Sequence, residues 1–385
     1  MTHPSLDLAR VRERFESSQD FTIGLEEEFA IVDPETLELR DAFEELYGAC
    51  QDDELLAESA AGELIASEIE IRSGRGESFG DAAQRQREHR ARLFALAEGM
   101  GLGLAATGTH PWASYLEQQI IDTPHYQRLA RDLGYVAQRN NTWSLHVHVG
   151  IRGAERAVAV CDRVRDLLPL LLAVSANSPF LDHRDTGLHS VRTETFTRTF
   201  PRCGIPESFG SWQAYVDFVQ LLERTGSVVE STQLWWSIRP HHAFGTIEVR
   251  ICDAQTGGAE SFALAALIAS CVVQTALDHD DGRGAAPLGQ RENEENLWRA
   301  IRHGMDGRLI DFEAGEEVEA RTALERLLAW VEPARETLGV EFALPPLNGA
   351  QRARRALEDG ASLEEIYGDA VAETRRTYVP EGVLG

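Results

Sequence analysis

The sequence predicts an α+β fold in which helices pack behind a largely antiparallel sheet. Segments with strand alternation are dispersed through the first two-thirds of the 385 residues, and helical periodicity dominates the remainder. No dinucleotide-binding fingerprint, internal repeat or low-complexity linker divides the chain. We therefore expect a single domain over residues 1–385, with an N-terminal helical extension at 1–19 and a C-terminal helical part at 290–380.

Strands and helices alternate in the first half of the chain. We predict a strand at residues 20–33, in which successive side chains alternate between two faces. One face carries Phe21, Ile23, Leu25, Phe29 and Ile31, and the other carries Thr22, Gly24, Glu26, Glu28 and Ala30. Further strands are expected at 63–72, 102–111 and 143–151. Helices are expected at 5–18, 78–100 and 122–138, followed by one long buried helix from Gly153 to just before Pro179.

The second half begins with an irregular segment at 181–210 and a helix at 211–224. Residues 234–241 and 245–253 are expected to form two strands joined by the short turn HAFG. Helices are then expected at 259–278, 291–304, 313–338 and 349–377. Residues 279–289 have the composition of a loop.

The charge composition excludes several function classes. The formal net charge is −26, so the surface should repel nucleic acids and anionic membranes. All 37 basic residues are arginine. The absence of lysine excludes a Walker-type phosphate loop and Schiff-base or pyridoxal-phosphate chemistry, so phosphate would have to be bound by arginines and metal ions. The same composition fits adaptation to molar salt, where charges are screened, or a GC-rich genome that replaces lysine by arginine.

Cysteine usage and hydropathy indicate a soluble, cytoplasmic protein. The five cysteines form no CxxC pair and are odd in number, which disfavours a disulfide framework or a structural zinc site. The N-terminus lacks the apolar stretch of a signal peptide, and no continuous apolar run is long enough to span a bilayer.

Two predicted strands carry paired carboxylates. Glu26 and Glu28 share one strand face at a separation of roughly 6–7 Å, where their mutual repulsion at an effective dielectric near 20 is about 2–3 kcal/mol. Glu68 and Glu70 repeat the pattern, with Glu63 at the entry of that strand. A divalent cation between such groups would reverse the sign of the interaction. The alternative is a solvated acidic face of a salt-adapted protein.

Two other strands add imidazole and guanidinium groups. His146 and His148 share a face in HVHVG, and Glu248 and Arg250 share a face in TIEVRICD. Arg239 lies near the end of the preceding strand. Paired histidines at i and i+2 can line a metal site on a sheet, although a core histidine is more often structural. A Glu-x-Arg pair could equally be a structural ion pair. Together the four strands predict a metal–phosphate site built without lysine.

The chain also resembles a known family. It carries, in this order between about residues 20 and 375, the motifs GLEEEF, SEIEIRS, GTHPW, HVHVG, SANSPF, TFPRCGIP, IRPHHAFGTIEVRICD and GAQRARR. This set resembles the type 2 glutamate–cysteine ligases, also called carboxylate–amine ligases; HVHVG together with TIEVRICD is the specific part. The acidic, lysine-free composition resembles the salt-adapted archaeal branch of that family, which is associated with making γ-glutamylcysteine as the main cellular thiol.

The resemblance implies a fold and a reaction. The fold is a glutamine-synthetase-like curved antiparallel sheet with helices on its convex side and the active site on its concave face. The reaction joins the γ-carboxylate of L-glutamate to the amine of L-cysteine through a γ-glutamyl phosphate, at the expense of ATP. Two or three Mg²⁺ (or Mn²⁺) ions are implied as cofactors, and relatives suggest a homodimer by analogy.

The resemblance also implies roles for individual residues. The metal ligands would be Glu26, Glu28, Glu63, Glu70, His146 and Glu248. His148 would face the nucleotide, Arg250 would hold phosphate or the acyl intermediate, and Arg239 and Arg192 would bind phosphate and the substrate α-carboxylate. Trp143-Ser144-Leu145 stands where many relatives have Cys-Gly, which leaves the acceptor amine open. A different amine acceptor, a metal-dependent hydrolase and a non-catalytic sensor of the same fold remain as alternatives.

Overall fold

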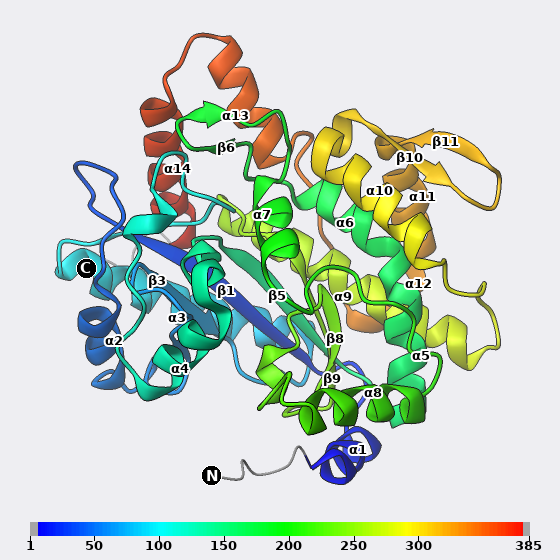
Figure 1. Ribbon diagram of the computed structural model, residues 1–385. Helices are drawn as coiled ribbons and strands as arrows, with labels where there is room; N and C mark the ends of the chain where they lie inside the picture. Colours follow the sequence, from blue (N-terminus) through cyan, green and yellow to red (C-terminus); the bar gives the residue numbers. More distant parts are fainter. Residues whose placement is uncertain (1–6, 380–385) are drawn as a thin grey trace.

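The computed structural model describes residues 7–379, and its centre is an antiparallel sheet (Figure 1). The strand order is β2-β3-β1-β5-β9-β8, and β4 pairs with the far end of β1. The strands are β1 (Ile23–Val32), β2 (Ala60–Ala61), β3 (Glu68–Arg72), β4 (Gly103–Ala105), β5 (Ser144–Gly150), β8 (Ile238–His241) and β9 (Thr246–Asp253). The predicted α+β class with a mainly antiparallel sheet is therefore confirmed.

Helices cover the face of the sheet that lies opposite Glu26 and Glu28. Leu25, Val147 and Val249 point into a core shared with α5 (Ala154–Val164), α6 (Leu168–Ser175) and α9 (Gly258–Asp280). Phe29 and Ile69 point into a second core, shared with α2 (Phe43–Gln51), α3 (Phe79–Gly99) and α14 (Leu363–Tyr378). The strand alternation thus leaves the opposite face free for polar groups.

The helix α9 is long and apolar enough to cross a membrane by length and composition alone. In this fold 83% of its most apolar window is buried, and it packs against β5 and α5. Its hydropathy is therefore accounted for by its place as a core helix.

A β-bulge changes the alternation in β9. The pairs Val147↔Val249 and Leu145↔Cys252 leave one additional residue on β9 between them. Strict alternation would place Cys252 on the same face as Glu248, but Cys252 lies in the core and Asp253 takes the polar face opposite Ser144. Bulges commonly re-aim side chains in this way next to functional sites.

Several elements differ from the predictions. The segment 181–210, predicted to be irregular, contains the hairpin β6–β7 (Phe180–Leu181, Arg184–Asp185) and the helix α7 (Val191–Thr199). The long helix predicted from Gly153 is divided into α5, a 3₁₀ turn at Arg165–Leu167 and α6, because Pro169 cannot donate a backbone hydrogen bond within a continuing helix. The strand predicted at 63–72 begins only at Glu68, so Glu63 lies in the irregular segment before it.

The C-terminal part also differs from the predictions. The predicted helix at 313–338 is replaced by the hairpin β10–β11 (Arg308–Asp311, Glu316–Glu319), followed by α11 (Ala320–Trp330) and α12 (Glu332–Leu338). The helix predicted at 349–377 is two helices, α13 (Gly349–Glu358) and α14, separated by a turn in which Gly360 has φ +98°. Glycine adopts this backbone conformation without a steric penalty.

The remaining helices agree with the predictions within a few residues. They are α1 (Leu8–Ser17), α4 (Pro124–Leu133), which continues into a 3₁₀ segment at Gly134–Asn140, α8 (Trp212–Arg224) and α10 (Gln290–His303). The first residues of the predicted helix 5–18 lie outside the described residues.

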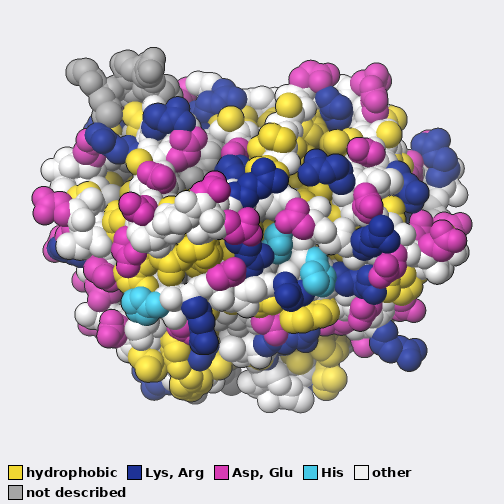
Figure 2. Space-filling view, turned by 90° about the horizontal axis from the view of Figure 1, so that it is seen from above, with side chains coloured by type: hydrophobic (Ala, Val, Ile, Leu, Met, Phe, Trp, Pro, Cys, Tyr) yellow, Lys and Arg dark blue, Asp and Glu magenta, His cyan; other side chains and the backbone are white. Residues whose placement is uncertain are grey.

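Arginine and acidic side chains are intermixed on the face shown in Figure 2. Many of them form surface ion pairs, such as Arg156 with Asp20 and Asp280, each at 2.7 Å. Such pairs contribute little stability, about 0–1 kcal/mol each.

Candidate active site

The three consecutive glutamates of β1 point to opposite sides of the sheet. Glu26 and Glu28 lie on the polar face: Glu26 is paired with Arg72 on β3 and His146 on β5, and Glu28 is paired with Glu70. Glu27 lies between them and points into the helical layer. Because side chains alternate along a strand, neighbouring residues here have separate surroundings.

Glu27 is fixed by groups from three helices. Its carboxylate accepts hydrogen bonds from Gln86 Nε2 (2.8 Å) and Arg90 Nη1 (3.0 Å) of α3, from Ser261 Oγ of α9 and from Tyr378 OH of α14 (3.4 Å). Its side chain is 5% exposed and that of Arg90 is 2% exposed. Glu27 therefore forms a buried ion pair that ties the sheet to the helices.

The polar face holds three clusters of possible metal ligands. Within each cluster the ligand atoms lie within 4.8 Å of one another. The clusters are Glu26–Glu70–His146, Glu26–His148–Glu248 and Glu28–Glu63–Glu70. All six residues predicted as metal ligands are members, and His148 joins them. Glu26 belongs to two clusters and Glu70 to two, so the three form one continuous array. A donor set dominated by carboxylate oxygen fits hard divalent cations such as Mg²⁺ or Mn²⁺.

At one end of this array the carboxylates outnumber the positive groups beside them. Burial raises the pKa of Glu63 and Glu70 and of the adjacent Glu68, and the charges of neighbouring glutamates raise it further. Arg72 Nε lies 2.9 Å from Glu70 Oε1 but does not outweigh these effects. Burial also raises the pKa of Glu28, although Arg192 and Ser144 oppose it. Closely spaced buried carboxylates in excess of their positive partners are the arrangement that a bound cation would stabilise.

The opposite end of the array is compensated by positive groups. Burial alone would raise the pKa of Glu26 and of Glu248. His148 beside Glu26, and Arg239 and Arg250 beside Glu248, outweigh this effect and hold both pKa values well below the usual range. These two carboxylates are therefore ionised at neutral pH.

The pKa values of the two histidines of β5 are shifted in opposite directions. Burial, together with the charge of Arg250, lowers the pKa of His146 to about 4, so this imidazole is neutral and can offer a lone pair to a cation. His146 Nδ1 lies 3.2 Å from Glu26 Oε2, and its Nε2 lies 2.8 Å from Ser144 Oγ. Burial would also lower the pKa of His148, but Glu26 and Glu248 raise it above the usual value. His148 Nε2 lies 3.2 Å from Glu26 Oε1.

Glu248 joins the two predicted arginines. Arg239 donates to it from Nε (2.5 Å) and Nη2 (3.2 Å), and Arg250 donates from Nη1 (2.5 Å). Arg239 also donates to the backbone carbonyl of Leu234 (2.6 Å), so its guanidinium is largely engaged within the protein. Arg250 retains a buried Nε without a partner and lines a pocket over the sheet.

Arg192 reaches the same pocket from α7. Its guanidinium donates to the carbonyls of Ile251 (3.0 Å) and Arg250 (3.3 Å) and lies 3.6 Å from Asp253. Asp253, which the sequence did not single out, accepts hydrogen bonds from Ser178 Oγ (2.7 Å) and Ser190 Oγ (2.9 Å). Ser190 is the N-cap of α7, so Asp253 fastens this helix, and Arg192 with it, to the sheet.

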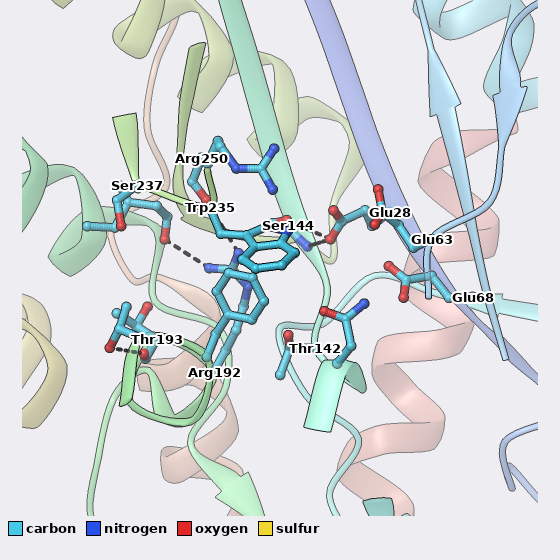
Figure 3. A pocket seen from close by; sticks show the side chains of 14 residues that line it. Glu28, Glu63, Glu68, Thr142, Ser144, Arg192, Thr193, Trp235, Ser237 and Arg250 are labelled. Carbon is cyan, nitrogen blue, oxygen red and sulfur yellow. Dashed lines mark hydrogen bonds between the residues drawn. The ribbon is translucent and has the colours of Figure 1, made fainter. Parts of the chain in front are cut away.

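Two pockets open at the two ends of the array. In the first, Figure 3 shows the carboxylates of Glu28, Glu63 and Glu68 on one side and the guanidinium groups of Arg192 and Arg250 on the other. We call it the zwitterion pocket because it presents both charges; Thr142, Ser144, Phe196 and Trp235 are among its other lining residues.

The second pocket has a volume of about 360 Å³ and adjoins Glu26 and His148. We call it the aromatic cavity, because the half-exposed ring of Phe244 lines it and stacks on His241, with ring centroids 4.4 Å apart and 12° between the planes. The helix α1 forms part of its wall and is held to the β8–β9 turn by Arg14 Nη1 donating to the His242 carbonyl (2.8 Å).

The raised carboxyl pKa values predict a dependence of stability on pH and metal. In the folded protein Glu63 and Glu70 retain protons at pH values where the unfolded chain has released them, so stability is lost as pH rises through the raised pKa values. We expect the melting temperature of metal-free protein to fall between pH 5 and pH 8, and excess Mg²⁺ to reduce this fall. Thermal melts with chelator or with Mg²⁺ measure both slopes.

The control for this prediction is Glu70→Gln, which removes one of the titrating groups. Its metal-free melting temperature should fall less steeply with pH than that of the wild type, because the amide does not ionise. Equal slopes with and without Mg²⁺ in the wild type would contradict the assignment of these carboxylates to a cation site.

Comparisons with known proteins find similarity to one family. The model of the family described as glutamate–cysteine ligase family 2 matches residues 22–375. A protein of Rubrobacter xylanophilus named glutamate–cysteine ligase 2-2 is 39% identical over 368 residues, which cover 94% of each chain. A protein of Sorangium cellulosum named glutamate–cysteine ligase 2 is 40% identical and covers 89% of this chain and 90% of its own. Salt adaptation and the archaeal branch are not addressed by these relatives and stay predictions.

Solved structures share the fold at low sequence identity. A glutamate–cysteine ligase from Francisella tularensis, determined in complex with AMP, superposes with a TM-score of 0.67 at 12% identity, covering 96% of this chain and 91% of that chain. A bifunctional glutathione synthetase from Pasteurella multocida gives a TM-score of 0.69 at 13% identity, covering 96% of this chain and 53% of that one.

Proposed function

Because the chain belongs to glutamate–cysteine ligase family 2, we propose that it forms γ-glutamylcysteine at the expense of ATP. The γ-carboxylate of L-glutamate takes the γ-phosphoryl group of ATP, which gives ADP and γ-glutamyl phosphate. The amine nitrogen of L-cysteine then attacks the carbonyl carbon, phosphate leaves, and the amine loses a proton as the amide forms. The observation that carries the proposal is the carboxylate–imidazole array that links the two pockets.

The aromatic cavity is the proposed nucleotide end. Phe244 offers an aromatic face for stacking a base, and the backbone of Gly24 brings a ligand close to the sheet. His148 lines this cavity beside Glu26 and Glu248, and its raised pKa favours an imidazolium that faces the phosphates and does not bind a cation.

The array itself is the proposed cation site. Two or three Mg²⁺ or Mn²⁺ ions would be held by five carboxylates and one imidazole of the array: Glu26, Glu28, Glu63, Glu70, Glu248 and His146. When bound, such ions neutralise the negative charge that the triphosphate and the glutamyl carboxylate bring together during transfer. The protein supplies fixed positions for the ligands, since all of them except Glu63 lie on paired strands.

Three arginines are assigned to binding the phosphoryl and carboxylate groups of the substrates. The proposed part of Arg250 is to bind phosphoryl oxygens and the acyl phosphate, because its guanidinium lines the zwitterion pocket beside His146. Arg239 holds Glu248 in place. Its proposed effect on the phosphates is therefore indirect, through the position of that carboxylate. Arg192 is assigned to the α-carboxylate of an amino acid in the zwitterion pocket.

An acceptor screen tests the proposal directly. Purified protein with ATP, Mg²⁺ and L-glutamate should release phosphate rapidly only when L-cysteine is added, and γ-glutamylcysteine should appear in equal amount. The assay should be run in molar KCl as well as in dilute buffer, because we propose that the charge of −26 reflects salt adaptation.

The remaining amino acids and common amines form the other arms of this screen. Product with another amine and none with cysteine would keep the ligase chemistry and replace the acceptor. Phosphate release that depends on no amine, or hydrolysis of a substrate without ATP, would contradict the proposed function.

A further inference from the structure

One buried carboxylate of the zwitterion pocket belongs to none of the three metal clusters. Glu68 is 1% exposed, and neither of its carboxylate oxygens has a hydrogen-bond partner within the described residues. Its neighbour across the strand pair is Ala30, which offers no polar side-chain atom. Leaving a buried carboxylate without a partner costs free energy, and a cationic group beside it would offset that cost.

The side chain of Glu68 faces the pocket. Figure 3 shows its carboxylate turned toward the space between Thr142 and Glu63, with Arg192 across the pocket. A ligand that enters this space can supply the partner that Glu68 lacks. A carboxylate and a guanidinium on opposite walls match the two charges of an α-amino acid.

The register of the sheet orders the groups along β1. From the aromatic cavity, the successive positions on the polar face are Gly24 beside His148, Glu26, Glu28 beside Glu70, and Ala30 beside Glu68. If phosphoryl transfer takes place over Glu26 and Glu28, the γ-carboxylate of glutamate lies there. Its α-carbon then lies one step farther along the strand, beside Glu68.

We propose that Glu68 binds the α-ammonium group of the donor glutamate while Arg192 binds its α-carboxylate, so that Glu68 determines specificity for an α-amino acid. This inference rests on the proposed function. It concerns the donor rather than the acceptor, because the acceptor amine must approach the γ-carbonyl over Glu28, whereas Glu68 lies beyond it. It also separates Glu68 from Glu70, two residues away, which belongs to two of the metal clusters.

Calorimetry with L-glutamate and with glutarate, which lacks the α-amino group, tests the assignment. The titrations use wild-type protein and Glu68→Gln, each with Mg²⁺ and a non-hydrolysable ATP analogue. We expect the wild type to prefer glutamate over glutarate by about 10- to 100-fold, as for a charge-assisted hydrogen bond. Glu68→Gln should lose most of this preference by weakening glutamate alone, and Glu68→Asp should regain part of it.

Three controls make the result decisive. Glu44→Gln, an exposed surface change with the same charge difference, should keep the wild-type preference. Mn²⁺ affinity should be unchanged in Glu68→Gln, and a thermal melt should show that this variant is folded. An unchanged preference, or an equal weakening of glutamate and glutarate, would overturn the role of Glu68.

The test also separates this inference from the proposed function. Wild-type protein that binds glutamate, with the preference intact in Glu68→Gln, would overturn only the inference. Wild-type protein that binds neither glutamate nor glutarate would overturn the proposed function, and the inference with it. Loss of turnover in Glu68→Gln with glutamate binding unchanged would assign Glu68 to the acceptor step and also overturn the inference.

Discussion

Glu26→Gln should abolish ligase activity, with a loss of at least about 10³-fold in kcat/KM, while the protein remains folded. Glu26 is shared by two of the three clusters, so one substitution weakens two proposed cation positions at once. A cation clamp contributes several kcal/mol to the stabilisation of a phosphoryl-transfer transition state, and each 1.36 kcal/mol corresponds to about tenfold in rate. The measurement is ATP-, glutamate- and cysteine-dependent phosphate release at saturating Mg²⁺.

The choice of glutamine keeps the shape of the side chain and removes only its charge. The matched control is again Glu44→Gln, which makes the same chemical change on the exposed face of α2 and should leave activity unaltered. Mn²⁺ titration should show fewer or weaker sites in Glu26→Gln. Activity within tenfold of the wild type would remove Glu26 from the cation site.

The polar face of the sheet could be predicted from the sequence because strand alternation is a local property. Alternation placed Glu26 with Glu28, His146 with His148 and Glu248 with Arg250, and the structure puts each pair on that face. What alternation could not supply was the distance between the strands. Their convergence depends on the pairing order β3-β1-β5-β9, which local patterns do not encode.

Asp253 and the helix α7 were missed for two different reasons. The bulge in β9 shifts the alternation by one residue, so the pattern alone assigns Asp253 to the wrong face. For α7 a signal was present: Ser190 accepts a hydrogen bond from the backbone N–H of Thr193 as an N-cap. The helix is short and rich in threonine, which has a low helix propensity, so its composition did not predict a helix.

Glu27 could not be interpreted from the sequence because its partners are distant. The groups that hold it follow it by 59 to 351 positions in the chain, on α3, α9 and α14. A glutamate on the apolar face of a strand conflicts with the pattern around it. Such a conflict indicates a compensated buried charge but does not identify the compensating residue.

Glu27→Ala should destabilise the protein by about 3–5 kcal/mol, which is a large part of the stability of a typical domain. The reason is the partner left behind: Arg90 is 2% exposed, and its charge would remain buried between the rings of Phe262 and Tyr378 without a carboxylate. Urea unfolding followed by tryptophan fluorescence measures the change. By contrast, Glu28→Gln, one residue away on the polar face, should leave the unfolding midpoint of metal-free protein unchanged or higher.

A second substitution separates the ion pair from simple loss of packing. If the cost arises from the uncompensated guanidinium, Glu27→Ala combined with Arg90→Met should recover much of the stability, because the double variant leaves no charge buried without a partner. If the cost arises from the cavity alone, the double variant should be no more stable than Glu27→Ala. The outcome decides whether the middle glutamate of GLEEEF is retained for its charge, while its two neighbours serve the opposite face of the same strand.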